Sequence, residues 1–416
     1  MTPPPTQPSY RALLDVPGLP RVVVAMLIAR VAQGMVGVAL VLFALAEYDS
    51  PELAGAVTLT SILPGLLVSP IAGALLDRHG RIRLVILDYL IALAALVLLG
   101  LLSIAGALPP LLLLAITIVS SLTSILSVTG LRSLFPLIVP KRLWERANAI
   151  DSNGYIASAI LGPPIAAVLV ETFGGAVALI VIGASFALAA LALVGAPDPV
   201  TDGPTSGSLL RDAWDGLRYT WQNPTLRGLG FSISLLNVAG GMITIVIPLI
   251  VIEGLGAGEA AVGLVFAASG LTGVLSAFFF GRLDTRGREW ILLVAPMILL
   301  APTVAILLAA AGTTNQPTGL ALVGLSQAVF GLLNGPLDIA LFTIRQRRTD
   351  QALLGRAFAV SMAFNFIGYP IGAALTGWVA AASIEAAILV GILSCLVATV
   401  MAAVMIPRQA DAMPVT

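Results

Sequence analysis

Charge, cysteine, histidine and lysine are all scarce in this sequence. Of its 416 residues only 10% are charged and 58% are hydrophobic, whereas a soluble domain carries roughly 25% charged residues. The single cysteine, Cys395, excludes a disulfide within the chain, and the single histidine, His79, excludes a histidine cluster for metal binding or for a catalytic triad. Net charge is zero, so the composition gives no reason to expect nucleic acid as a partner.

Motifs for nucleotide hydrolysis and for catalysis are also missing. No Gly-x4-Gly-Lys-Ser/Thr loop is present, so the sequence gives no support for ATP-driven transport within this chain. We therefore expect neither an enzyme nor a bound cofactor. The proline-rich start of the chain lacks the features of a cleaved signal peptide and is interpreted as a short cytoplasmic tail.

Long apolar runs occupy most of the chain, and each is long enough to cross a hydrocarbon layer of roughly 30 Å. The connections between them are mostly short, which favours antiparallel helices packed in a bundle. The sequence therefore predicts an all-α membrane protein. Its twelve expected transmembrane helices are residues 21–46, 53–76, 84–105, 110–134, 148–170, 175–196, 226–252, 260–281, 290–311, 318–343, 357–380 and 383–406.

The positions of lysine and arginine predict the orientation. Short cytoplasmic loops are enriched in these residues. All of them except Arg30 and Arg132 fall in the two tails, in the connections that follow even-numbered spans, or, for Arg21 and Arg227, in the first two residues of the span that follows such a segment. This pattern predicts a multi-pass protein of a bacterial cytoplasmic membrane with both termini in the cytoplasm. The bacterial origin is suggested by the abundance of Ala and Gly and by arginine nearly replacing lysine.

Two sequence matches at nearly the same spacing indicate an internal duplication. The pattern Asp-x-x-Gly-Arg occurs at Asp77 after the second span and at Asp284 after the eighth, and Arg146-Ala147 returns as Arg356-Ala357. Parallel repeats are a known transporter design with the substrate site between the halves. The expected organisation is a tail (1–20), a six-helix half (21–196), a linker (197–225), a second six-helix half (226–407) and a tail (408–416).

The linker contains a segment with helical periodicity, residues 208–222, in which two tryptophans and two leucines fall on one face. Such a helix is expected to lie on the cytoplasmic membrane surface. An equally acceptable interpretation is a soluble linker helix that packs on the bundle.

The loop after the second span resembles the signature loop of the major facilitator superfamily, with Gly73, Asp77 and Gly80 in the characteristic places. The resemblance implies the major facilitator fold and a charge network that locks the outward-facing state, with Asp77 as its central anion. A plain solvated loop is the alternative interpretation. The conformational-lock residues implied are Gly73, Asp77, Arg78, Gly80, Arg81 and Arg83, with the partial repeat Asp284, Gly287 and Arg288.

Other segments are similar to the bacterial branch of this superfamily that exports drugs and siderophores. Gly162-Pro163 in the fifth span looks like a weakened antiporter motif, although small residues at such spacing also serve helix packing. The mid-span arginine motif of proton-coupled drug antiporters is missing, because Arg132 lies near the cytoplasmic end of the fourth span. The coupling mechanism therefore stays open.

Polar residues inside the spans are candidates for a substrate and proton pathway, because such residues are costly in lipid and usually face the interior. Asp338 is the first choice for a proton-binding carboxyl, and a structural ion pair with Arg345 is the alternative. Arg30 could contact an anionic substrate or pair with Asp338, or it could extend to the cytoplasmic headgroups. The candidate pathway residues are Arg30, Gln33, Asn237, Gln327, Asn334, Asp338 and Asn365.

Two aspartates near cytoplasmic helix ends, Asp88 and Asp151, are expected to pair with arginines of the loops rather than with substrate. Taken together, the sequence predicts a monomeric secondary transporter that uses a proton gradient to export a small amphipathic solute. The alternatives are a lipid or lysolipid translocator of the same fold and a membrane receptor without flux. The lipid bilayer and a small-molecule substrate are the expected partners.

Overall fold

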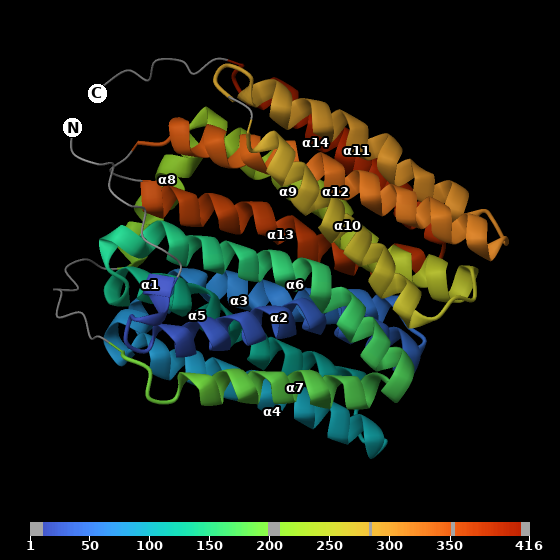
Figure 1. Cartoon of the computed structure of the whole chain (residues 1–416). Coiled ribbons are helices and arrows are strands. Elements are labelled where there is room, and N and C mark those ends of the chain that lie inside the picture. Colours follow the sequence, from blue (N-terminus) through green and yellow to red (C-terminus); the bar gives the residue numbers. More distant parts are fainter. Residues whose placement is uncertain (1–10, 199–208, 283–284, 351–353, 409–416) are drawn as a thin grey trace.

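The computed structural model describes residues 11–198, 209–282, 285–350 and 354–408, and in these ranges the chain is almost entirely helical and contains no strand (Figure 1). The elements are α1 (Arg11–Leu14), α2 (Leu19–Tyr48), α3 (Pro51–His79), α4 (Arg81–Ile104), α5 (Pro110–Ile138), η1 (Lys141–Leu143), α6 (Trp144–Phe173), α7 (Gly175–Leu193), α8 (Leu209–Gln222), α9 (Pro224–Pro248), η2 (Leu249–Gly254), α10 (Glu259–Phe280), α11 (Glu289–Ala311), α12 (Gln316–Arg347), α13 (Leu354–Ala380) and α14 (Ile384–Met405).

Several helices begin where the sequence supplies both a capping side chain and a proline. The Ser50 hydroxyl accepts a hydrogen bond from Leu53 N at 3.1 Å, and the Asn223 side chain accepts one from Leu226 N at 3.1 Å. In both cases a proline follows the capping residue, where its missing N–H costs nothing. These signals place helix starts on either side of the membrane.

Eleven of the described helices are long and apolar enough to cross a membrane. The remaining long helix, α13, has 27 residues, more than the roughly 20 that a span needs. Its apolar sequence is interrupted by Asn365, Tyr369 and Pro370. With α13 the bundle has the predicted twelve spans, and the helices extend a few residues beyond the predicted boundaries at most ends.

Helix contacts repeat from one half of the chain to the other. In the first half α2 packs on α6 and α7, α3 on α5, and α4 on α5 and α7. The second half repeats every one of these pairs: α9 packs on α13 and α14, α10 on α12, and α11 on α12 and α14. This pattern agrees with the predicted two six-helix pseudo-repeats of the major facilitator fold, and α8 lies between them in the chain.

The arginine-rich end of the bundle carries Arg81, Lys141 and Arg348, whereas the acidic end carries Asp49 and Glu171. The two halves meet closely through α3 with α13 and α6 with α10. At the acidic end, the carboxylate of Glu171 on α6 accepts a hydrogen bond from Ala260 N at the start of α10, at 2.6 Å. Gly377 near the end of α13 lies directly against the Pro51 carbonyl at the start of α3.

Glycines allow the helices of each half to approach closely. A Cβ atom at Gly162 would lie 2.6 Å from the carbonyl carbon of Gly34, so α6 and α2 touch backbone to backbone at this point. Of the predicted helix-packing pair, Gly162 thus lies at the α2–α6 contact, while the Pro163 carbonyl lies beside Gly263 on α10. In the second half, Gly372 on α13 occupies the corresponding position against Val238 on α9.

Substitution of Gly372 tests this packing. We expect Gly372→Ala to lower the free energy of unfolding by about 1–3 kcal/mol, because the new Cβ would meet the backbone of α9 and force the helices apart. The measurement is thermal unfolding of the purified protein in detergent. Gly324→Ala on α12 is the matched control, since nothing lies within 4 Å of a Cβ at Gly324. Equal unfolding temperatures for the two variants would contradict this account.

Candidate functional site

Four residues of the first half form a group that we call the arginine–tyrosine cluster: the buried Arg30 on α2, the exposed Arg132 on α5, and the buried Asp151 and half-buried Tyr155 on α6. Arg30 Nη2 donates to one oxygen of Asp151 at 2.9 Å, and Arg132 Nε donates to the other at 2.8 Å. The Tyr155 ring lies against both guanidinium groups, with its centroid 3.4 Å from Arg30 Cζ and 4.7 Å from Arg132 Cζ. One carboxylate thus joins three helices.

This cluster decides between the alternatives for Arg30. Its side chain is only 4% exposed, so it does not extend to headgroups, and its carboxylate partner is Asp151 rather than Asp338. The expectation that Asp151 pairs with loop arginines was wrong in its detail, because both partners come from within the helices. Spacing along the sequence gave no sign of this, since the ion pair joins residues on helices α2 and α6.

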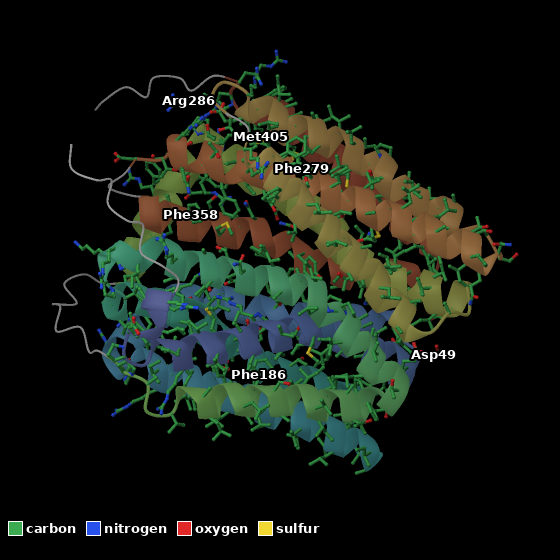
Figure 2. All side chains as sticks on the ribbon, viewed as in Figure 1. Asp49, Phe186, Phe279, Arg286, Phe358 and Met405 are labelled. Carbon is green, nitrogen blue, oxygen red and sulfur yellow. The ribbon has the colours of Figure 1, made fainter. Side chains whose placement is uncertain are left out.

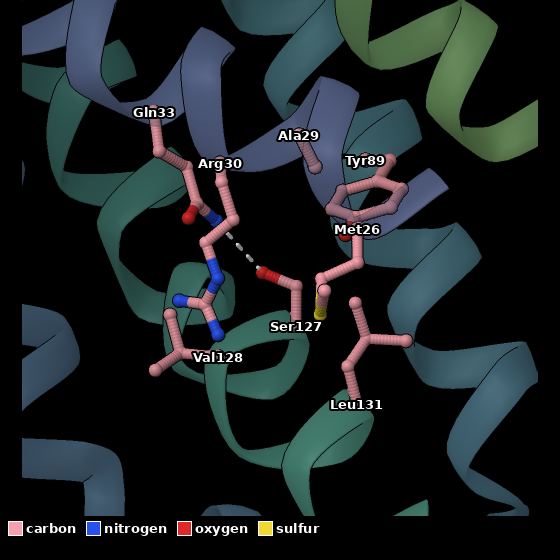
Figure 3. Close-up of a pocket in the computed structure, with 8 residues that line it drawn as sticks. All are labelled: Met26, Ala29, Arg30, Gln33, Tyr89, Ser127, Val128 and Leu131. Carbon is pink, nitrogen blue, oxygen red and sulfur yellow. Dashed lines mark hydrogen bonds between the residues drawn. The ribbon is translucent and has the colours of Figure 1, made fainter. Parts of the chain in front are cut away.

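Next to the cluster, a chain of polar groups leads from α2 through α5 to α4. Gln33 Nε2 donates to the Ser127 hydroxyl at 3.2 Å, beside Arg30 in a small pocket (Figure 3). The buried Asp88 carboxyl lies near the hydroxyls of Ser127 and Thr123. Among the residues that the structure describes, no lysine or arginine pairs with Asp88. The prediction of a loop arginine as its partner is not met.

Helix α12 places Asp338 on an exposed surface, and within the described ranges this carboxylate has no ion-pair or hydrogen-bond partner. Leu325 and Leu332 are the strongly exposed leucines of the same helix. Their positions are about 120–140° around the helix from Asp338. Asp338 and the half-buried Asn334, one turn away, therefore face a different direction from the leucines that suit lipid.

Gln327 lies two turns before Asn334 on α12 and is buried. Its side-chain nitrogen has no hydrogen-bond partner in the described structure. Asn237 on α9 and Asn365 on α13 meet directly, because Asn237 Nδ2 donates to the Asn365 carbonyl at 2.8 Å. The predicted pathway residues thus divide into three groups rather than one. Arg30 and Gln33 lie in the first half, and the others lie on α12 or at the α9–α13 contact.

The second half contains a buried arginine that lacks a carboxylate. Arg345 on α12 is 0% exposed. Its guanidinium lies 2.8 Å from the Met362 sulfur and 5.0 Å from the Phe358 ring centroid, and the Asn365 amide oxygen can accept from it. No acid among the described residues pairs with it. Arg345 Nε and the Ser361 hydroxyl both lack partners.

A comparison of the two halves explains why Asp151 has no counterpart beside Arg345. Ser361 and Asn365 stand 210 positions after Asp151 and Tyr155, the same spacing as the Arg146-Ala147 repeat. At this spacing serine replaces the aspartate and asparagine replaces the tyrosine, while glycine and phenylalanine stand in place of Arg30 and Arg132. The buried Arg345 therefore occupies a position of its own on α12. This substitution pattern is visible in the sequence, but its meaning requires the position of Arg345.

The loop between α3 and α4 is organised by an aspartate that sequence reasoning missed. The carboxylate of Asp198, at the start of the linker, accepts hydrogen bonds from the backbone nitrogens of Arg81 at 2.9 Å and Ile82 at 3.1 Å. Gly80 makes this possible with a positive φ of 89°. An acidic cap at the start of a helix is favourable because it meets unpaired N–H groups and the helix dipole.

Of the predicted lock residues, Arg81 is buried and its Nε donates to Ser133 at 3.0 Å, while Arg78, Arg83 and Arg288 are exposed. Gly287 repeats the positive φ of Gly80, at 73°. Asp284 lies outside what the structure describes, and so do the burial of Gly73 and the side chain of Asp77. The role of Asp77 as a central anion stays a prediction.

Family comparison matches the chain to the Major Facilitator Superfamily over residues 22–239 and again over 229–415. The chain belongs to this superfamily. Its members are membrane transporters and not enzymes, so this major facilitator protein is a multi-pass transporter with a lipid bilayer and a small-molecule substrate as partners.

The transporter is 37% identical over 412 residues to the uncharacterised MFS-type transporter y4rN of Sinorhizobium fredii, covering 98% of this chain and 99% of that one. It is 27% identical to the enterobactin exporter EntS of Citrobacter koseri, over 89% of this chain and 85% of the relative.

Among solved structures, a mutant of the nucleoside transporter NupG matches with a TM-score of 0.77 at 14% identity, covering 93% of this chain and 99% of that one. An inward-facing, occupied bacterial homologue of the human lysosomal transporter Spinster matches with a TM-score of 0.73 at 13% identity, covering 95% and 97%. At these identities the likeness establishes the fold alone.

Restoring the missing acid tests the account of Arg345. Ser361→Asp places a carboxylate on the face of α13 that contacts Arg345. We therefore expect the midpoint of thermal unfolding in detergent to rise by about 2–4 °C. This is the shift that ~1 kcal/mol of added stability produces in domains of 150–250 residues. Ser361→Asn has a similar volume without the charge and should not give this rise. A fall in the midpoint for Ser361→Asp alone would show that Arg345 is already compensated.

Proposed function

We propose that this protein is a proton-coupled exporter of a small amphipathic solute that works by alternating access of its two halves. The observation that carries the proposal is the unpaired Asp338 carboxylate, exposed on a face of α12 that differs from the face of the exposed leucines. A carboxyl inside a span is costly and usually functional. Binding and release of one proton there changes the charge of this membrane-spanning helix by a full unit.

The contacts between the halves support alternating access. Two close approaches across the halves, Glu171 with Ala260 and Gly377 with Pro51, lie at the acidic end. If the arginine-rich end is cytoplasmic, as the positive-inside rule indicates, this arrangement corresponds to a state closed to the outside. Rocking of one half against the other then closes the arginine-rich end, and the signature loop around Asp77 would hold that second state.

Export is the direction that the relatives favour, because EntS is an enterobactin exporter. The few polar side chains of the candidate pathway suit an amphipathic solute rather than a sugar or an ion. In this scheme, Asp338 takes a proton from the outside and releases it into the cytoplasm, and the protonated state favours the return of the empty carrier.

Loss of the Asp338 charge tests proton coupling. In proteoliposomes with an imposed pH gradient, we expect wild-type protein to accumulate amphipathic compounds from a panel that includes enterobactin, and Asp338→Asn to lower the initial gradient-driven rate at least about tenfold. Glu385→Gln is the control, since Glu385 lies at the acidic end and its carboxylate accepts from Ser383. Full gradient-driven accumulation by Asp338→Asn would remove the proton role.

Cysteine labelling tests the sidedness. In a Cys395→Ser background, Ala107→Cys lies in the α4–α5 connection and Lys141→Cys lies after α5, and both native positions are exposed. We expect a membrane-impermeant maleimide to label Ala107→Cys in intact cells and Lys141→Cys only after permeabilisation, because the arginine-rich end faces the cytoplasm. The opposite pattern would invert the orientation, and with it the direction of transport.

A further inference from the structure

We propose that the arginine–tyrosine cluster binds an anionic group of the transported solute, with Arg132 as the residue that contacts it. The ligand class is an amphipathic anion that carries a carboxylate, a phosphate or a comparable group. This inference names the chemical class of the solute. It rests on the proposed function only in one respect, namely that the bound solute is also transported.

Charge inside the cluster does not balance. Arg30 and Arg132 contribute two positive charges, and Asp151 contributes a single negative charge that both arginines share, one on each oxygen. The Tyr155 ring partly stabilises the two cations through its face, but it supplies no counter-charge. One unit of positive charge therefore remains for an anion to neutralise.

The two arginines differ in access. The Arg30 side chain is 4% exposed, whereas the Arg132 side chain is 56% exposed. Arg132 uses Nε for Asp151, and its two terminal nitrogens have no acceptor among the described residues. A guanidinium with both terminal NH2 groups free presents the planar fork that binds a carboxylate or phosphate through two parallel hydrogen bonds.

Arg132 is also held in place before any ligand arrives. Its hydrogen bond to Asp151 and its contact with the Tyr155 ring fix the guanidinium between α5 and α6, two helices that otherwise scarcely touch. Fixing a side chain in advance reduces the entropy cost of binding. Asp151, Arg30 and Tyr155 are thus positioning residues for Arg132.

The surroundings point to an amphipathic rather than a small hydrophilic anion. Arg132 lies six residues before Ile138, the last residue of α5, and therefore about 9 Å inside the helix end. Val128 and Leu131, on the preceding turn of α5, line the neighbouring pocket together with Arg30. A ligand that reaches Arg132 with its charged group leaves its apolar part among side chains of this kind.

The test compares two probes of nearly identical shape, 2-naphthoate and the uncharged 2-naphthamide, by thermal shift of the full-length protein in lipid-free detergent. We expect 2-naphthoate to raise the unfolding temperature of the wild type and 2-naphthamide to have little effect. Arg132→Gln should weaken 2-naphthoate binding by about 10- to 100-fold, the loss expected for a charge-assisted hydrogen-bonded pair. Arg132→Lys keeps the charge without the fork and should retain part of the affinity.

The Arg132→Gln variant is expected to fold, because Asp151 keeps its ion pair with Arg30. Arg282→Gln is the matched control, since Arg282 is an exposed arginine stacked on Phe278 at the arginine-rich end. It should bind 2-naphthoate like the wild type. The proposal is overturned if neither probe shifts the wild type, if both shift it equally, or if the 2-naphthoate shift survives in Arg132→Gln.

A lipid headgroup could supply the same anion chemistry, so a second arm adds phosphatidylglycerol in place of 2-naphthoate. Stabilisation by this lipid alone, lost in Arg132→Gln, would overturn the solute site and assign Arg132 to lipid. Failure of proton coupling would be seen separately, because these binding measurements use no pH gradient.

Discussion

A charge buried within a bundle of apolar helices must be compensated by an opposite charge or by neighbouring polar groups. The Asp151 carboxylate compensates the buried Arg30 and also pairs with the exposed Arg132. Its ion pairs hold α2, α5 and α6 together in the first half. Removal of one partner from such a buried pair is strongly destabilising, because the remaining charge is left without compensation. The arrangement therefore constrains how these three helices can move relative to one another.

The second half meets the same requirement differently. It repeats the helix contacts of the first half, yet its buried Arg345 is surrounded by a sulfur, an aromatic ring and an amide instead of an acid. Duplication preserved the scaffold while the ionisable residues diverged. The two halves thus share their helix contacts but differ in how a buried arginine is compensated. Other exposed charges lie at the two ends of the bundle, where Figure 2 shows Arg286 and Asp49 far apart.

Contacts between helices differ within the halves and between them. Within each half, backbone contacts at Gly162 and Gly372 lock α2 to α6 and α9 to α13. Between the halves, Ala260 N donates a hydrogen bond to the Glu171 carboxylate at the acidic end, and Gly377 lies against Pro51 there. The halves also meet further along α6 and α10, where a Cβ atom at Gly270 would lie 3.0 Å from the Ala159 carbonyl oxygen. The two halves are thus separate packing units that meet along two helix pairs.

The amino-acid sequence by itself determined the membrane location, the number of spans, the duplication and the superfamily, because hydropathy, arginine placement and the Asp-x-x-Gly-Arg repeat are local or periodic signals. It also identified Asp338 and Arg30 as unusual residues. Only the tertiary structure decided which charges meet. Asp151 bonds to arginines 121 and 19 positions away, and Asp198 caps a helix that begins 117 positions earlier. Such pairings depend on how helices pack against one another, which hydrophobic periodicity along a single helix does not specify.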